Sequence, residues 1–113
     1  MSTSKNKVQL CGNLGADPDV KIFDNGTRMV RISLATHEVI RNKAGELVEQ
    51  TYWHNLVCWG KVAEMAEQNL HKGMEVAIEG KLESRAYTDK EGHKRYVTEV
   101  NVSHLLITEP KNV

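Results

Sequence analysis

Residues 50–70 read QTYWHNLVCWGKVAEMAEQNL, and this stretch decides how the chain folds. Its first half, from about Gln50 to Trp59, has the alternating pattern of a half-buried strand. Its second half, from Lys61 to Leu70, places apolar side chains near one helical stripe. Gly73 is expected to end that helix near its C′ position. The segment therefore predicts a strand that leads directly into a single helix.

Four further strands are predicted around this segment. Two precede it, from Lys7 to Leu14 (with a short continuation at Val20–Phe23) and from about Thr27 to Val39. Asn25-Gly26 joins them, since this pair tolerates the positive φ of a type I′ turn. Two more follow the helix, Glu75–Tyr87 and Lys94–Ile107.

One helix between the third and fourth of five antiparallel strands predicts an all-β OB-fold barrel. A chain of 113 residues has room for one domain only. We therefore expect a single OB domain over 1–113, with its core at about 6–108.

Net charge is zero, from 15 basic and 15 acidic residues. Residues 1–43 carry seven Lys/Arg and four Asp/Glu (+3), whereas residues 44–113 carry eight and eleven (−3). Nucleic-acid binding usually needs a basic surface, so it must depend here on where the charges point. No secretory signal or membrane-length apolar run is present. We expect a cytoplasmic protein without a membrane partner.

Catalytic chemistry finds little support in the sequence. The five histidines are scattered, and no hydrolase, metalloprotease or phosphate-binding motif is present. We expect no catalytic residue, no metal, no cofactor and no enzyme activity. Cys11 and Cys58 lie in apolar strand-like runs, so both are expected to be reduced core thiols.

The aromatic residues are the main functional candidates. Trp53 and Trp59 are six residues apart on one strand, so they project to the same face, beside Asn55. Tyr87 lies on the charged face of its strand with Arg85. Exposed rings of this kind stack on unpaired bases, at about 1–3 kcal/mol per base. The alternatives are that both indoles fill the barrel core and that Tyr87 is held in a strand-end contact.

Basic side chains would follow the nucleic-acid backbone, although each one alone is more often a solvated charge than a contact. The pairs in the two hairpins, Arg41 with Lys43 and Lys94 with Arg95, are best placed to wrap a strand. The full candidate set is Arg31, Arg41, Lys43, Lys61, Lys72, Arg85, Lys94 and Arg95.

Short motifs in order along the chain resemble the bacterial single-stranded DNA-binding protein family, from Asn6 to Thr108. They include Gly12-Asn13-Leu14-Gly15, Trp53-His54, Gly60-Lys61 and Tyr96-Val97-Thr98-Glu99. The resemblance implies an OB-fold homotetramer wrapped by single-stranded DNA. It places Trp53, Trp59 and Tyr87 at stacking positions, Lys61, Lys72 and Arg85 at DNA contacts, and His54 at a subunit interface. We also assign Val8 and Leu10 to that interface.

The chain departs from the family pattern in three ways. Ile40 stands where well-known members place a stacking Trp, and Asn55, His71 and Glu83 stand where some carry Arg. The chain ends at residues 109–113 without the family's acidic tail, so replication and repair proteins are not expected to be recruited through a tail.

The function expected from the sequence is sequence-tolerant binding and protection of single-stranded DNA in replication, recombination and repair. The protein would be nucleoid-associated and most simply a homotetramer, with a dimer also open. One alternative is a primosome-type OB accessory protein that acts through protein contacts. The other is a small hydrolase or metalloenzyme.

Overall fold

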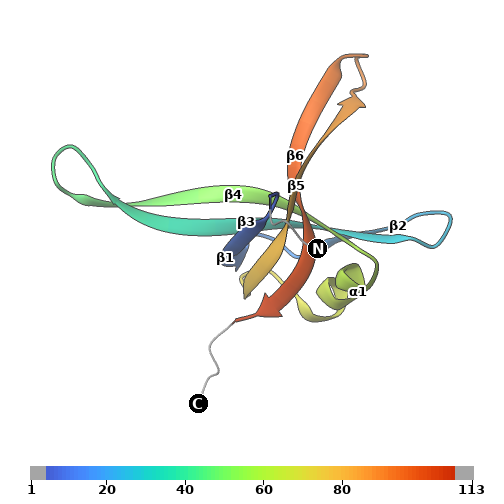
Figure 1. The fold of residues 1–113 in the computed structure, drawn as a ribbon, viewed down its shortest axis with the longest axis horizontal. Helices are drawn as coiled ribbons and strands as arrows, with labels where there is room; N and C mark the ends of the chain where they lie inside the picture. The colour runs from blue at the N-terminus through green and yellow to red at the C-terminus, as the bar shows by residue number, and fades with distance from the viewer. Residues whose placement is uncertain (1–4, 109–113) are drawn as a thin grey trace.

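The computed structural model describes residues 5–108, which form six strands and one helix (Figure 1). The expectation about the C-terminal tail concerns residues outside this range. The elements in chain order are β1 (Val8–Leu14), β2 (Asp19–Ile22), β3 (Arg28–Arg41), β4 (Leu47–Trp59), α1 (Gly60–Asn69), β5 (Glu75–Thr88) and β6 (Lys94–Ile107).

The strands form a closed barrel, which confirms the predicted OB fold. The hydrogen-bonded order is β1-β5-β6-β4-β3-β2, and β1 also pairs with β3 at Asn13–Ala35 and Leu14–Leu34. The pairing of β4 with β6, at Leu56–Val100, is parallel, so the strands are not all antiparallel as predicted.

The predicted short continuation of the first strand is a strand of its own. β2 pairs with β3 from Asp19–Arg31 to Ile22–Arg28. Pro18, which has no N–H to donate to a ladder, separates it from β1. Counting β2 places the helix between β4 and β5, although its place in the barrel is the predicted one.

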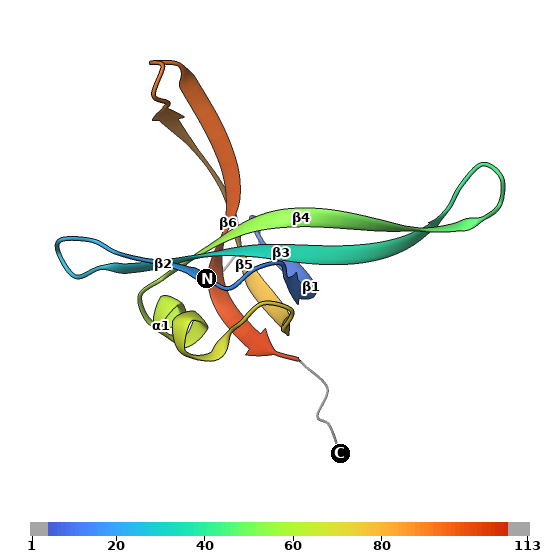
Figure 2. The same ribbon diagram turned by 180° about the vertical axis from the view of Figure 1, so that it is seen from behind.

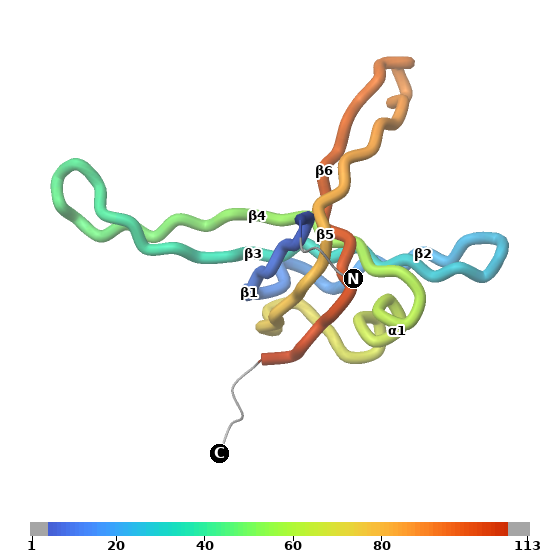
Figure 3. Tube along the Cα trace, in the orientation of Figure 1, coloured from blue at the N-terminus to red at the C-terminus, as the bar shows by residue number. Residues whose placement is uncertain are grey.

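Three hairpins project from the barrel and share one turn design (Figures 2 and 3). In each, the N–H of a glycine with positive φ (Gly26, Gly45 or Gly92) donates to the carbonyl three residues earlier. A second backbone bond closes the loop one residue further out, as between Phe23 and Thr27. The first turn therefore spans residues 23–26, with Asp24 and Asn25 at its centre and Gly26 as its last residue, whereas the sequence predicted a two-residue type I′ turn centred on Asn25 and Gly26.

Helix α1 lies close to its predicted position but ends earlier than Gly73 suggested. It spans Gly60–Asn69, and the N–H of Leu70 donates to the carbonyl of Ala66. Gly73 adopts its φ of 89° in the following turn, where its N–H donates to the carbonyl of Leu14. This glycine therefore ties the turn to β1 and does not cap the helix.

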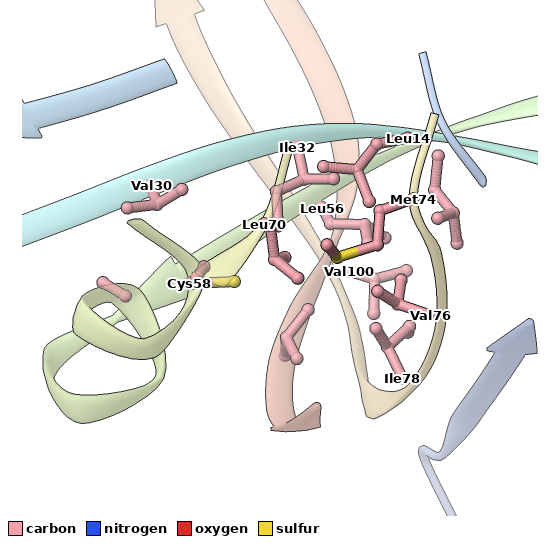
Figure 4. Close-up of a cluster of buried hydrophobic side chains, with 14 residues drawn as sticks. Leu14, Val30, Ile32, Leu56, Cys58, Leu70, Met74, Val76, Ile78 and Val100 are labelled. Carbon is pink, nitrogen blue, oxygen red and sulfur yellow. The ribbon is translucent and has the colours of Figure 1, made fainter. Parts of the chain in front are cut away.

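One apolar core fills the barrel and seats the helix against it (Figure 4). Leu34, Val30, Val76 and Cys58 are completely inaccessible to solvent, as is Ala63 of the helix. The core cluster comprises Leu14, Val30, Ile32, Leu34, Leu56, Cys58, Ala63, Ala66, Leu70, Met74, Val76, Ile78, Val100 and Val102.

The two cysteines have different environments. Cys58 is a core thiol, as predicted, and burial raises its pKa to about 12, so the unreactive thiol form dominates at neutral pH. Cys11 is exposed on the outer face of β1, so its predicted place in the core is wrong. Leu14 is the β1 side chain in the core cluster, and Val8 and Leu10 pack at the margin of that cluster.

Candidate nucleic-acid interface

The two tryptophans of β4 are exposed on the barrel surface. Trp53 exposes 62% of its surface and Trp59 exposes 41%. These values exclude the alternative that both indoles fill the core. Between them, Asn55 is exposed but Val57 is buried, at the point where β4 pairs with β6. The face therefore presents two separate rings and not a continuous strip.

Gly15 lets the ring of Trp53 pack directly against the backbone. A Cβ atom at Gly15 would lie 2.4 Å from Cζ3 of the indole, so only glycine lets the ring lie this close to the backbone. The backbone there is held by a 2.9 Å bond from the Gly15 N–H to the Ser33 carbonyl. In the sequence, Gly15 stood out only as part of the Gly12-Asn13-Leu14-Gly15 motif, because its contact with position 53 is made by the fold.

Trp59 has an aromatic neighbour that sequence reasoning also missed. The rings of Phe23 and Trp59 are stacked, with centroids 6.0 Å apart and planes inclined by 16°. Lys21 places its ammonium 5.0 Å from the centroid of Phe23. The only sequence signal for this group was the position of Phe23 directly before the Asp24-Asn25-Gly26 turn.

The hairpin of β5 and β6 carries two exposed tyrosines. Tyr87 exposes 46% of its surface and Tyr96 exposes 72%, and the Lys94 ammonium lies 5.8 Å from the ring of Tyr96. Tyr87 lies opposite Arg95 in the strand register. On the β3–β4 hairpin, Ile40 is 38% exposed and offers an aliphatic surface without a π-face.

Arg31 and Arg85, both predicted to contact DNA, share the carboxylate of Glu99. The Arg31 Nη1 to Glu99 Oε2 distance and the Arg85 Nε to Glu99 Oε1 distance are both 3.0 Å. Glu99 is 6% exposed and is the buried charged residue of the described chain. Because Arg31 belongs to β3, and Arg85 and Glu99 belong to the β5–β6 hairpin, this carboxylate links the β3–β4 hairpin to the β5–β6 hairpin.

Two other predicted cations also bond within the protein. Arg41 donates to the Gly45 carbonyl at 2.6 Å, inside its own hairpin. Arg95 Nε lies 2.9 Å from Asp89 Oδ2, and this bond, with the backbone N–H of His93, holds the Asp89 pKa below its ordinary value. Within residues 5–108, the four predicted lysines form no ion pair: Lys43, Lys61, Lys72 and Lys94.

The residues predicted at a subunit interface belong to β1 and β4. Val8 and Leu10 are half-buried at the margin of the core, and His54 Nε2 is 2.9 Å from Thr36 Oγ1. Residues 8–12 of β1 pair with β5 on one side only among the described strands. Beside them, an open hollow is lined by Gln9, Leu10, Cys11, Ala77, Ile78, Glu79, His104, Leu105 and Leu106.

Two further features of residues 5–108 concern metal ions and membranes. No three His, Cys, Asp or Glu side chains gather there in a way that would hold a metal ion. In the same range, no helix combines the length and apolar character needed to cross a membrane.

A closed OB barrel with exposed rings on its hairpins is the architecture of a nucleic-acid-binding OB domain. The chain belongs to the single-strand binding protein family, which it matches over residues 5–108. It is 48% identical over 98 residues to single-stranded DNA-binding protein 1 of Xylella fastidiosa (strain 9a5c), covering 86% of this chain and 72% of that protein.

Two solved structures share the fold at 30% identity. The single-stranded DNA complex of the Plasmodium falciparum protein superposes with a TM-score of 0.85, covering 96% of this chain and 99% of that one. A deletion mutant of the Thermus aquaticus single-stranded DNA-binding protein gives a TM-score of 0.81, covering 92% of this chain and 50% of that one.

Proposed function

We propose that the protein binds single-stranded DNA without sequence preference, by stacking bases on exposed aromatic rings. The observation that carries the proposal is the exposure of Trp53 and Trp59 on one face of β4, with Tyr87 on the second long hairpin. The Plasmodium falciparum relative, solved in complex with single-stranded DNA, supports the same ligand class. Indole and phenol rings stack on any base, so the binding does not depend on sequence.

Stacking offsets the neutral charge of the chain. Each base that stacks contributes about 1–3 kcal/mol, so three rings supply several kcal/mol without a net positive surface. The lysines at positions 43, 61 and 72 are exposed, and they are the cations best able to reach phosphates. Arg31, Arg41, Arg85 and Arg95 must share their guanidinium groups with the internal partners described above.

Self-association is the second part of the proposal, with a homotetramer as the favoured state. The free edge of residues 8–12 fits pairing with the same strand of a second copy. The hollow over β1, β5 and β6, where Leu106 is 64% exposed, offers an apolar face for further contact. His54 would act through this assembly and not through DNA.

In the cell, such a protein protects DNA strands exposed during replication, recombination and repair, and acts without chemistry of its own in the cytoplasm. A primosome-type accessory protein is the less favoured function, because its main ligands would be proteins and the exposed rings of β4 would have no role. Solution mass separates the two: a stable dimer with weak DNA affinity would favour the accessory protein.

Titration with oligo-dT tests the proposal directly. Both indoles should report binding, so Trp emission should fall strongly with oligo-dT and not with duplex DNA. Emission that stays constant across micromolar oligo-dT would contradict the proposed function.

A further inference from the structure

Phe23, directly after β2, continues the aromatic surface of β4 onto the turn between β2 and β3. Its ring is stacked on Trp59, and the planes differ by only 16°. The backbone holds Phe23 at two points: its N–H donates to the Thr27 carbonyl at 2.9 Å, and its carbonyl accepts from the Gly26 N–H at 2.8 Å. The two-ring surface is therefore built on a fixed turn.

A cation lies beside this pair of rings. Lys21 pairs with Met29, and Met29 pairs with Trp59, so these three residues form one row across β2, β3 and β4. Directly paired residues project to the same face of a sheet. The ammonium of Lys21, 5.0 Å from the Phe23 centroid, is therefore on the face that carries Trp59.

The turn and the two rings line an open hollow on the surface. Its lining consists of Phe23, Asp24, Asn25, Thr27 and Trp59. The Asn25 Oδ1 accepts from the Thr27 N–H at 3.0 Å, which holds the polar side of the hollow in place. A flat apolar wall, a polar rim and a nearby cation together match the base, the base edge and the phosphate of one nucleotide.

We propose that this hollow is a nucleotide subsite that extends the DNA path from β4 onto the β2–β3 turn. One base stacks on Trp59, Phe23 holds the indole in its orientation, and Lys21 contacts the adjacent phosphate. The subsite rests on the proposed function, because its occupant is a nucleotide of single-stranded DNA. Its particular content is the role of Phe23 and Lys21, neither of which the sequence marked.

A purely structural role is the competing explanation for Phe23, since its ring also covers part of Trp59. Such a role would lower stability on substitution without changing how DNA affinity depends on salt. Lys21 separates the two explanations, because it is exposed and its charge adds to binding only if a phosphate lies near it.

The experiment compares Phe23→Leu and Lys21→Gln with Ile22→Ala in binding of labelled oligo-dT, measured by anisotropy over a range of salt. Ile22 is the matched control, because it lies between the two positions and is 57% exposed. Phe23→Leu should weaken binding about 2- to 12-fold, the range for loss of an aromatic pair. Lys21→Gln should make the slope of log K against log salt shallower by about 0.7. Ile22→Ala should bind within twofold of the wild type.

A Trp53→Phe background leaves Trp59 as the single indole, because the chain has two Trp residues. In that background, oligo-dT should still quench emission, and Phe23→Leu should reduce the quench. If the wild type binds oligo-dT and neither Phe23→Leu nor Lys21→Gln changes that binding, the proposed subsite is overturned but the proposed function is not. A less stable Phe23→Leu together with an unchanged slope for Lys21→Gln would also overturn it. No binding of oligo-dT by the wild type would instead remove the proposed function itself.

Discussion

Glu99→Gln should strengthen binding of single-stranded DNA, because Glu99 partly offsets the charge of two arginines, Arg31 and Arg85. Its carboxylate lies 3.0 Å from both Arg31 and Arg85, and it is 6% exposed. The cluster carries two positive charges and one negative charge. Glutamine keeps the shape and one acceptor oxygen but removes the negative charge, so the net charge of the cluster rises from +1 to +2.

The magnitude follows from Coulomb's law. A phosphate held by either guanidinium would lie about 6 Å from the carboxylate, where repulsion is about 0.7 kcal/mol at a dielectric constant of 80 and about 2.8 kcal/mol at 20. The arginine side chains are 39% and 46% exposed, so solvent screening favours the lower value. We therefore expect a gain of about 3- to 10-fold at low salt. The slope of log K against log salt should steepen by about 0.7.

Anisotropy of labelled oligo-dT at several salt concentrations measures both quantities. Glu64→Gln is the matched control, because it removes the same formal charge from an exposed position of α1. Arg31→Gln in the Glu99→Gln background should cost more affinity than Arg31→Gln alone, since only the freed guanidinium reaches phosphate fully. An equal gain in Glu64→Gln, or weaker binding of Glu99→Gln with an unchanged slope, would refute the predicted effect of Glu99 on its arginines. A melting curve of each variant checks that the fold is intact.

Three further predictions follow from the interface. Gly15→Ala should weaken oligo-dT binding severalfold with little change in melting temperature, because the new Cβ would lie 2.4 Å from the Trp53 ring and the side chain must move; a wild-type affinity would mean that the packing of Trp53 against Gly15 is unimportant. Trp53→Ala should weaken binding more than Lys43→Ala, by about 1–3 kcal/mol for a lost stack; equal losses in titrations at one salt concentration would show that charge dominates. The Asp89 pKa is depressed from 3.8, so the support that its carboxylate gives the β5–β6 turn is present above that pH and is lost as pH falls through its lower folded value. Amide exchange at Glu91 and His93, whose N–H groups donate to Asp89, should therefore rise at acid pH ahead of exchange in the core, and this difference should vanish in Asp89→Asn.

Local patterns were sufficient to predict the barrel, because they record which side of each strand is buried. Val76 and Ile78 alternate with polar neighbours on β5, and Ala66 lies on the apolar stripe of α1. Periodicity carries no information on pairing partners, so the parallel contact of β4 with β6 and the separate strand β2 were missed. Cys11 shows the same limit: an apolar run does not say which of its residues point outward.

The interface was predictable only where a single strand defines it. Trp53 and Trp59 could be placed on one face because both belong to β4. Their supports come from elsewhere in the chain, since Gly15 precedes β2 and Phe23 follows it. Such contacts depend on the tertiary fold, and no spacing within one strand indicates them.

The same limit explains why the predicted cations are not equally free to contact DNA phosphates. Sequence reasoning treated Arg31, Arg85 and Arg95 as free charges, but acidic side chains brought near by strand pairing now hold all three. Pairing inside the protein reduces the number of DNA counterions that its cations can displace, and salt dependence follows that number. Stacking is far less sensitive to salt. Binding by this protein should therefore persist at salt concentrations that release proteins held mainly by phosphate contacts, and we expect its rings, with their supports at Gly15 and Phe23, to determine its affinity.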